Sequence, residues 1–301
     1  MNIPPPLRAG DKIGIIATGK KVFASDLETA IATITSWGLQ VELGPHLFDN
    51  EHKYLAALDK HRHADLQAMI SNPDIKAIIC ARGGYGTTRI MDQIDYRPLQ
   101  VMPKWIAGFS DVTALHMKLF TLNIASIHGT MPLLFPNPKA STSVQSLRNA
   151  LFGSPEIIRA EPSASNRPGE AVGIVAGGNL SLVADALGTR SEPQLEGCIL
   201  ILEEVDEHLY RIDRMLTHLQ RAGKLGVLSA LIIGHMSDLK DTTPGFGDSV
   251  NEIVLQKMQG SACPIAFNFP TGHENPNIAW QHGTRMKLSV SDSGSVLQPF
   301  V

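Results

Sequence analysis

A serine at the end of an apolar run is the first residue of this 301-residue sequence that could do chemistry. In WIAGFSDVTALH (105–116), Ser110 stands between a strand-like run and a helix-like pattern. A sharp strand-to-helix turn would expose its hydroxyl as a nucleophile, and the backbone N–H of Asp111 could bind a developing oxyanion. Val112 occupies the final glycine position of G-x-S-x-G, so a simple helix cap by the serine or the aspartate is the alternative.

The stretch ARGGYGTT (81–88) is a second candidate, because it places consecutive glycines after an apolar run. Glycines let backbone N–H groups approach a ligand closely, so the loop could cradle a phosphate or supply a second oxyanion donor. No Gly-Lys-Ser/Thr follows, which excludes a P-loop, and G-x-G-x-x-G is absent. A plain tight turn is the alternative.

A serine nucleophile needs a base, and an imidazole base needs a carboxylate that holds its tautomer. His273 lies in the polar loop NFPTGHENPN at a predicted strand end, where a catalytic loop residue is expected, and His128 in ASIHGT is a weaker rival. Acids gather in LILEEVDEH, and Glu203 is attached most directly to the apolar strand. A structural histidine and a solvated acidic cluster are the alternatives; no partnering cluster supports a metal at these acids. Histidines on helix-like patterns are expected to be packed or solvated: His61, His63, His116 and His218.

The elements that must position these side chains form an alternating pattern. Short apolar, β-branched runs alternate with helical patterns, such as those near 23–37 and across roughly 54–71, which predicts a mostly parallel, doubly wound α/β sheet. Ligands on such sheets lie beyond the carboxyl ends of the strands, where the glycine loop and Ser110 fall. The strand-like runs are KIGIIA (12–17), LQVELG (39–44), KAIICA (76–81), KWIAGF (104–109), AVGIVAG (171–177), CILILEEV (198–205) and ALIIGHM (230–236).

The stretch from about 131 to 170 is rich in Pro, Ser and Asn around one short helical piece, which predicts a crossing between two domains. After Trp280, MKLSVSD and SVLQPF are typical of closing antiparallel strands. We therefore expect a nucleophile domain, a linker, and a C-terminal α/β domain that carries the candidate acid and base, over residues 1–135, 136–168 and 169–301.

The composition is that of an ordinary globular protein, with 43 % hydrophobic and 18 % charged residues. A net charge of -3 gives no general electrostatic reason to bind nucleic acid. Cys80, Cys198 and Cys263 each adjoin an apolar run without metal-type spacing, so we expect buried free thiols. The N-terminus shows no signal-like apolar core and no run is long enough to span a bilayer, so we expect a cytoplasmic protein with no membrane partner.

Five stretches together resemble the LD-carboxypeptidase family of serine peptidases, also called muramoyltetrapeptide carboxypeptidases. They are GFSDVTALH, ARGGYGTTRI, GGNLSLV, LILEEVDEHLYRIDRML and FPTGHENPN, in this order and over most of the chain. The resemblance implies a flavodoxin-like N-terminal domain, a C-terminal domain and an active site between them. It implies a triad in which Ser110 is the nucleophile, His273 the general base and Glu203 the orienting acid.

The same resemblance implies oxyanion-hole amides at Gly84 and Asp111, with Gly83 as the near alternative, and it implies a homodimer without cofactor or metal. The family typically works in the bacterial cytoplasm in peptidoglycan recycling. It removes the terminal D-alanine from L-Ala-D-Glu-diaminopimelate-D-Ala tetrapeptides by cutting an L–D bond. Relatives with the same triad cleave peptide–nucleotide antibiotics and confer immunity, so the triad alone does not separate the two substrates.

A carboxypeptidase must recognise the free carboxylate of its substrate, through a cation or backbone N–H groups. We expect Arg82, Gly83 and Arg211 to contact the substrate, with Arg214 as a further candidate; structural ion pairs are the alternative for each arginine. Many family members carry a Ser-Pro-type stretch after the first strand, whereas this chain has ATGKK (17–21), which leaves the substrate preference open. A non-catalytic small-molecule-binding protein of the same two-domain form is the alternative from another class.

Overall fold

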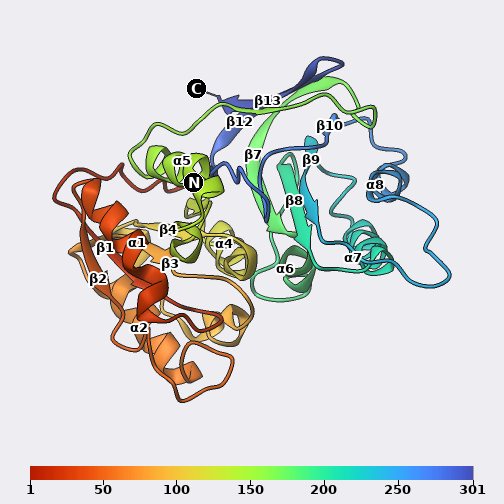
Figure 1. Ribbon diagram of the computed structural model, residues 1–301. Helices are drawn as coiled ribbons and strands as arrows, with labels where there is room; N and C mark the ends of the chain where they lie inside the picture. Colours follow the sequence, from red (N-terminus) through yellow and green to blue (C-terminus); the bar gives the residue numbers. More distant parts are fainter. Residues whose placement is uncertain (301) are drawn as a thin grey trace.

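The computed structural model describes residues 1–300 and contains two β-sheets that lie beside each other (Figure 1). The elements of the first sheet and its connections are β1 (Lys12–Ile16), α1 (Ala24–Ser36), β2 (Gln40–Leu43), α2 (Asp59–Ser71), β3 (Ile75–Cys80), α3 (Arg97–Val101), β4 (Trp105–Gly108), α4 (Thr113–Thr121), β5 (Ser126–His128) and β11 (Trp280–His282). The remaining elements are α5 (Ser141–Leu151), β6 (Ile158–Ala160), β7 (Gly169–Asn179), α6 (Leu180–Asp185), β8 (Ile199–Val205), α7 (Leu209–Arg221), β9 (Ala230–Ser237), α8 (Val250–Lys257), β10 (Ile265–Ala266), β12 (Arg285–Ser291) and β13 (Gly294–Pro299).

The first sheet has the strand order β11-β5-β4-β3-β1-β2. Its strands β2, β1, β3, β4 and β5 are parallel, and the order 2-1-3-4-5 is that of flavodoxin-like folds. Only β11, which comes from far along the chain, is antiparallel to its neighbour β5. The predicted doubly wound parallel sheet is therefore confirmed. The carboxyl ends of β1, β3 and β4 meet at one edge, so the loops that follow them come together.

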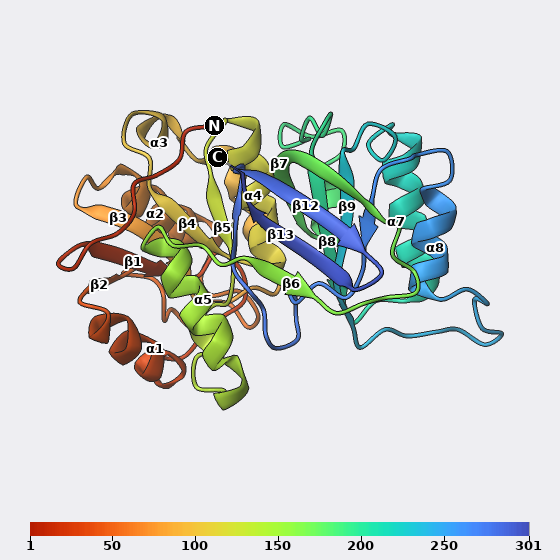
Figure 2. The same cartoon turned by 90° about the horizontal axis from the view of Figure 1, so that it is seen from above.

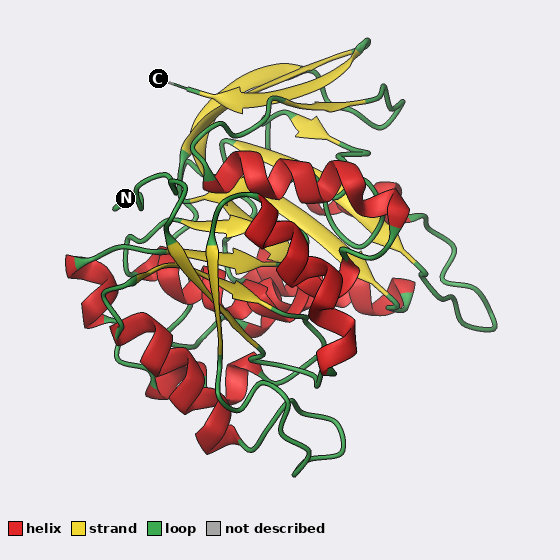
Figure 3. Ribbon diagram, turned by 60° about the vertical axis from the view of Figure 1, so that its left-hand side comes forward, coloured by secondary structure: helices red, strands yellow, loops and turns green. Residues whose placement is uncertain are grey.

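The second sheet has the order β10-β9-β8-β7-β12-β13-β6. Strands β7 to β10 are parallel, while β12, β13 and β6 are added in antiparallel pairs. Figure 3 shows the long antiparallel ribbon at the edge of the molecule near the C-terminus. These are the closing antiparallel strands that the sequence predicts after Trp280.

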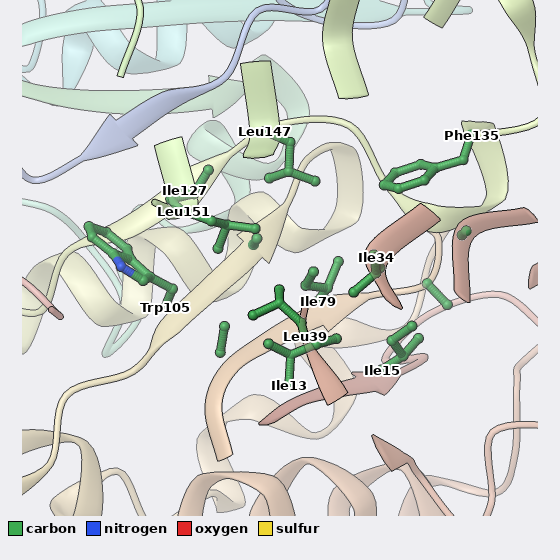
Figure 4. Packing of buried hydrophobic residues seen from close by; sticks show 14 of the residues in the cluster. Ile13, Ile15, Ile34, Leu39, Ile79, Trp105, Ile127, Phe135, Leu147 and Leu151 are labelled. Atoms are coloured by element: carbon green, nitrogen blue, oxygen red, sulfur yellow. The ribbon is translucent and has the colours of Figure 1, made fainter. Parts of the chain in front are cut away.

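The central strands are buried on both faces, which explains their continuous apolar runs. One face of the first sheet packs Ile13, Ile79 and Ile127 against Ile34 of α1 and Leu147 of α5 (Figure 4). Fully burying each such side chain contributes about 1.5–3 kcal/mol. The other face forms a second cluster that includes Ile16, Ile78 and Ile106 with Leu66 of α2 and Leu115 of α4.

Helix α4 lies between the two sheets and packs against both β5 and β7 (Figure 2). The stretch 136–168 contains α5, which packs on the first core, and β6, an edge strand of the second sheet. Strand β11 returns to the first sheet and pairs Trp280 with His128. The domain boundaries expected from the sequence stay a prediction, and β11 joins the two parts by backbone hydrogen bonds.

Two local expectations need correction. The helix expected across roughly 54–71 begins only at Asp59, because the preceding backbone pairs elsewhere: Lys21 N–H donates to the Tyr54 carbonyl at 3.0 Å. Cys80 and Cys198 are buried free thiols as predicted, whereas Cys263 is only partly buried. Within residues 1–300, no helix is long and apolar enough to cross a membrane.

Candidate active site

The turn after β4 holds Ser110 in a strained conformation. Phe109 is extended, with φ -149°, and Ser110 has φ 60°, in the left-handed region that costs a non-glycine residue about 1–2 kcal/mol. A short 3₁₀ turn, η3 (Ser110–Val112), then leads into α4. Within residues 1–300 neither Ser110 nor Asp111 caps the helix with its side chain. Ser110 is therefore partly exposed at the carboxyl edge of the sheet, on a sharp strand-to-helix turn of the kind that can present a nucleophile.

The glycine loop after β3 lies directly against this serine. A Cβ built on Gly83 would lie 2.9 Å from Ser110 Cβ and 3.1 Å from its Oγ. Gly84 has φ 103°, and a Cβ there would meet Lys20 Cβ at 2.6 Å. The N–H groups of Gly83, Gly84 and Asp111 find no acceptor within the described chain, so all three are available to a ligand. Both glycines are therefore required by close approach, Gly83 to the serine and Gly84 to the loop after β1.

The Asp111 side chain fixes the glycine loop to the serine turn. It is buried and accepts hydrogen bonds from Thr87 N at 2.9 Å and Thr87 Oγ1 at 2.7 Å. Burial raises the pKa of the Asp111 carboxyl, and the hydrogen bonds from Thr87 oppose that rise. Thr87 Oγ1 also lies 2.8 Å from Thr18 Oγ1. The loops after β1, β3 and β4 are thus held together by one small buried network.

His273 and Glu203 are joined by the shortest polar contact of the site. His273 Nδ1 lies 2.6 Å from Glu203 Oε2, and the Glu203 side chain is 0 % exposed. Burial acts to lower the pKa of His273, but the hydrogen bond and the charge of Glu203 outweigh it, and the net pKa is raised. With Nδ1–H donated to the carboxylate, Nε2 is left to accept a proton.

Two glycines make the approach of the His273 loop possible. A Cβ on Gly272, which has φ 124°, would lie 2.9 Å from Glu203 Cβ. A Cβ on Gly234 of β9 would lie 2.5 Å from the Thr271 carbonyl oxygen. The loop can therefore press onto the end of the second sheet only because neither position carries a side chain.

The adjacent acid, Glu204, points to different partners. Its carboxylate accepts from Asn179 Nδ2 at 2.8 Å and from Ser181 N and Oγ at 2.9 and 2.7 Å. Burial raises the pKa of Glu204. Asn179 N–H in turn donates to Thr113 Oγ1 at 3.0 Å, which links β7 to the first turn of α4. This contact between β7 and α4 is not among those predicted from the sequence. The paired glycines of GGN indicate it, because a Cβ on Gly178 would lie 2.6 Å from Thr113 Oγ1.

Phe109 connects the serine turn to the histidine–glutamate pair. Its ring centroid lies 4.8 Å from that of His273, and Ser110 is the next residue. No hydrogen bond joins Ser110 Oγ to His273 within residues 1–300. Such catalytic contacts are often loose without substrate. The structure thus brings His273 and Glu203 into direct contact, and it packs the His273 ring against Phe109, the residue before Ser110.

The other predicted residues lie in varied surroundings. Arg82 Nη1 donates to the Lys21 carbonyl at 3.0 Å, so its guanidinium holds the loop after β1. Arg211 is exposed and lies 3.5 Å from Glu207. His128 is fully buried, and burial lowers its pKa well below the usual 6.5, so it cannot reach a substrate. Arg214 stacks over a tyrosine ring with its guanidinium 5.6 Å from the centroid.

The comparisons with known proteins cover both halves of the chain. The family model for the LD-carboxypeptidase N-terminal domain matches residues 13–129, and that for the C-terminal domain matches residues 172–288. A Bacillus subtilis protein named probable murein peptide carboxypeptidase is 32 % identical, over 98 % of this chain and 94 % of that protein.

Two solved structures share the fold. The crystal structure of a muramoyltetrapeptide carboxypeptidase from Oxalobacter formigenes has a TM-score of 0.87 and 29 % identity, over 96 % of this chain and 100 % of the other. The microcin C7 self-immunity protein MccF, solved with aspartyl sulfamoyl adenosine, has a TM-score of 0.87 and 19 % identity, over 99 % of this chain and 98 % of the other. At that identity, the second similarity concerns the fold alone.

Proposed function

The chain belongs to the LD-carboxypeptidase family of serine peptidases, and on that premise we propose that it releases the terminal D-alanine of murein tetrapeptides through Ser110, His273 and Glu203. The observation that carries the proposal is the buried His273–Glu203 contact of 2.6 Å, set against the residue before a strained serine. Together these features provide a nucleophile, a base and an acid that orients the base.

In the proposed reaction, Ser110 Oγ attacks the carbonyl carbon before D-alanine, and its proton passes to His273 Nε2. The buried carboxylate of Glu203 stabilises the imidazolium that forms. The tetrahedral intermediate collapses to an acyl-enzyme, and the proton on His273 passes to the leaving amine of D-alanine. Water then attacks the acyl carbon while His273 accepts a proton from it, and His273 returns this proton to Ser110 Oγ as the ester bond breaks.

The negative oxygen of the tetrahedral intermediate needs hydrogen-bond donors. We assign this role to the N–H groups of Gly84 and Asp111, with Gly83 as the near alternative. The support is that these amides lack an acceptor in the described chain, that Asp111 follows Ser110 directly, and that Gly83, the neighbour of Gly84, lies against Ser110. Losing one such donor typically costs about 3–4 kcal/mol of transition-state stabilisation.

The terminal carboxylate of the substrate needs a cation or free amides. Arg82 is better suited than Arg211, because it precedes Gly83 and its guanidinium is already anchored by the Lys21 carbonyl. A preorganised guanidinium loses less freedom on binding a carboxylate than a mobile one. Arg211 is engaged by Glu207 at the surface and must exchange that partner to bind substrate.

A second candidate substrate is a peptide–nucleotide antibiotic. The fold is shared with MccF, and the loop ATGKK (17–21) lies against the glycine loop: Lys20 Cβ is 2.6 Å from where Gly84 would carry a Cβ. This loop departs from the pattern of many family members, and two lysines there could contact an anionic or nucleotide group. The same triad would serve either substrate.

The test is D-alanine release from L-Ala-D-Glu-diaminopimelate-D-Ala, followed by chromatography. The matched control is the same peptide ending in L-alanine, which the proposal expects to resist cleavage. Aspartyl sulfamoyl adenosine is the second probe. Cleavage of that compound alone would replace the first proposal with the second, and cleavage of neither would contradict both. The cytoplasmic location and the homodimer expected from the family stay predictions; light scattering on the purified chain tests the dimer.

A further inference from the structure

A separate group of polar side chains lies on the loop after β2 and on α2. The rings of His46 and His61 are stacked, with centroids 4.2 Å apart and planes 19° from parallel. Asp49 Oδ2 lies 2.9 Å from His61 Nδ1, and Glu51 Oε2 lies 3.2 Å from the same nitrogen. One ligand atom from each of His46, Asp49 and His61 lies within 4.8 Å of the others.

A buried carboxylate stands behind one of these histidines. Asp65 is 3 % exposed; its Oδ1 lies 2.7 Å from His46 Nδ1, and its Oδ2 accepts from His46 N–H at 3.1 Å. Gly44 makes room for it, since a Cβ there would lie 2.5 Å from Asp65 Oδ2. With Nδ1–H donated to Asp65, Nε2 of His46 is oriented as an acceptor. Metal-binding histidines are commonly held in this way by a carboxylate.

The charge of the group favours a cation. Three carboxyl groups, those of Asp49, Glu51 and Asp65, lie against the stacked rings of His46 and His61, so acidic side chains gather around the two imidazoles. The side chains of His46, His61 and Asp49 are 31 %, 23 % and 26 % exposed, which leaves an entry path for an ion.

We propose that His46, Asp49 and His61 bind a divalent ion of the zinc class, with Glu51 as a fourth ligand and Asp65 holding His46. Imidazole nitrogen with carboxylate oxygen suits zinc and its neighbours better than calcium or magnesium. Ligand atoms about 2.0–2.1 Å from a tetrahedral ion lie roughly 3.3 Å apart. The distances of 2.9 and 3.2 Å from His61 Nδ1 to the two carboxylates are close to that spacing. The ligand atoms of His46, Asp49 and His61 lie within 4.8 Å of one another, so the loop after β2 must move closer to α2 when the ion binds.

The ion would fix a loop that borders the candidate active site. From Asp49 the chain runs to Tyr54, whose carbonyl accepts from Lys21 N–H at 3.0 Å, and Ala56 N–H donates to the Gly19 carbonyl at 3.0 Å. Tyr54 Oη lies 3.4 Å from the position of a Cβ on Gly84. The ion therefore acts as a structural clamp on this loop and takes no part in the reaction.

The test is calorimetric titration of zinc chloride into the full chain, prepared without a histidine tag and stripped with a chelator. We expect one saturable site in the wild type. His46→Ala, His61→Ala and Asp49→Asn should each weaken zinc binding at least tenfold, and Asp65→Asn by about 10–100-fold. His63→Ala is the matched control on the same helix, because the hydrogen bond of His63 goes to the Gln93 carbonyl and to no member of the proposed site, and this variant should bind zinc as the wild type does.

Cobalt(II) provides an independent readout, since a tetrahedral nitrogen–oxygen site gives visible absorption bands that saturate at one equivalent. Those bands should persist in His273→Ala, which separates this site from the catalytic pair. Circular dichroism without metal checks that each variant is folded, and Asp49→Asn keeps the test valid if a histidine variant is not. The proposal is overturned if the wild type shows no saturable binding. It is equally overturned if folded His61→Ala and Asp49→Asn bind zinc as tightly as the wild type.

Discussion

His273 and Glu203 are 70 residues apart in the sequence, yet Nδ1 of one lies 2.6 Å from Oε2 of the other. The carboxylate is fully buried at the end of β8, while the imidazole sits on the loop that follows β10. A buried carboxylate raises the basicity of its histidine and fixes which ring nitrogen is free. This relationship is the physical basis for assigning the general base.

Glu203→Gln should lower kcat by roughly 10³–10⁴-fold with a smaller effect on KM, because an amide cannot enforce the same tautomer or stabilise the imidazolium. Steady-state D-alanine release measures this. Asp206→Asn is the matched control at the same strand end, since the Asp206 side chain is 67 % exposed and forms a surface ion pair with Lys240. Equal losses in both variants would argue against a special role for Glu203.

The pH profile of kcat/KM should fall on the acid side through the raised pKa of His273. A protonated imidazole cannot accept the Ser110 proton, so activity is present above that pKa and lost below it. Because Glu203 is the cause of the raised pKa, Glu203→Gln should move this acid limb to lower pH. An acid limb at the same pH in both proteins would contradict the assignment of the titrating group.

Gly83→Ala should reduce turnover strongly, since the added methyl would lie 2.9 Å from Ser110 Cβ and 3.4 Å from the N–H nitrogen of Asp111. Gly226→Ala is the matched control, because a Cβ there meets nothing within 4 Å and its φ is not positive. Kinetics on the two folded variants compare them. Wild-type kcat in Gly83→Ala would show that the glycine loop does not border the reacting centre as described.

Acid should destabilise the fold through its buried histidines. Burial lowers the pKa of His116 to about 4 and those of His128 and His282 well below 6.5. A group whose pKa is lowered in the folded state contributes stability that is complete above pH about 6.5 and is lost as the pH falls toward the lowered value. Urea unfolding at pH 7.5, 6.0 and 5.0 should show this loss.

His128→Phe isolates part of that effect. Both ring nitrogens of His128 are buried without a partner in the described chain, and its ring stacks 5.0 Å from Trp280. An apolar ring of similar shape removes the cost of an unsatisfied polar group. The variant should equal or exceed the wild type in unfolding free energy at pH 7.5 and lose less on acidification. Marked destabilisation at pH 7.5 would mean that an ordered partner had been lost.

The sequence predicts the sheets well because their central strands are buried on both faces. Runs such as KAIICA and CILILEEV must then be apolar throughout, and their carboxyl ends locate the polar residues. Strand periodicity also implies that Glu203 and Glu204 point to opposite faces. Periodicity does not show which of the two glutamates meets His273, because that contact depends on the path of the loop after β10.

Long-range packing accounts for what sequence reasoning missed. Strand β11 joins the first sheet although it follows strands β6 to β10 of the second sheet in the chain, and no local pattern around Trp280 encodes that partner. The hydrogen bond from Arg82 to the Lys21 carbonyl depends on the path of the loop after β1, which no local pattern encodes. His46 and His61 come together only because the irregular chain between β2 and α2 turns back on itself.

The proposed reaction depends first on Ser110 as the nucleophile that releases D-alanine. Its most direct test compares release from the diaminopimelate-containing tetrapeptide by wild type and Ser110→Ala, with the exposed Ser154→Ala purified in parallel as a control for contaminating activity. We predict release by the wild type and the control, and a rate at least about 10³-fold lower for Ser110→Ala. Release by Ser110→Ala at the wild-type rate would contradict the account.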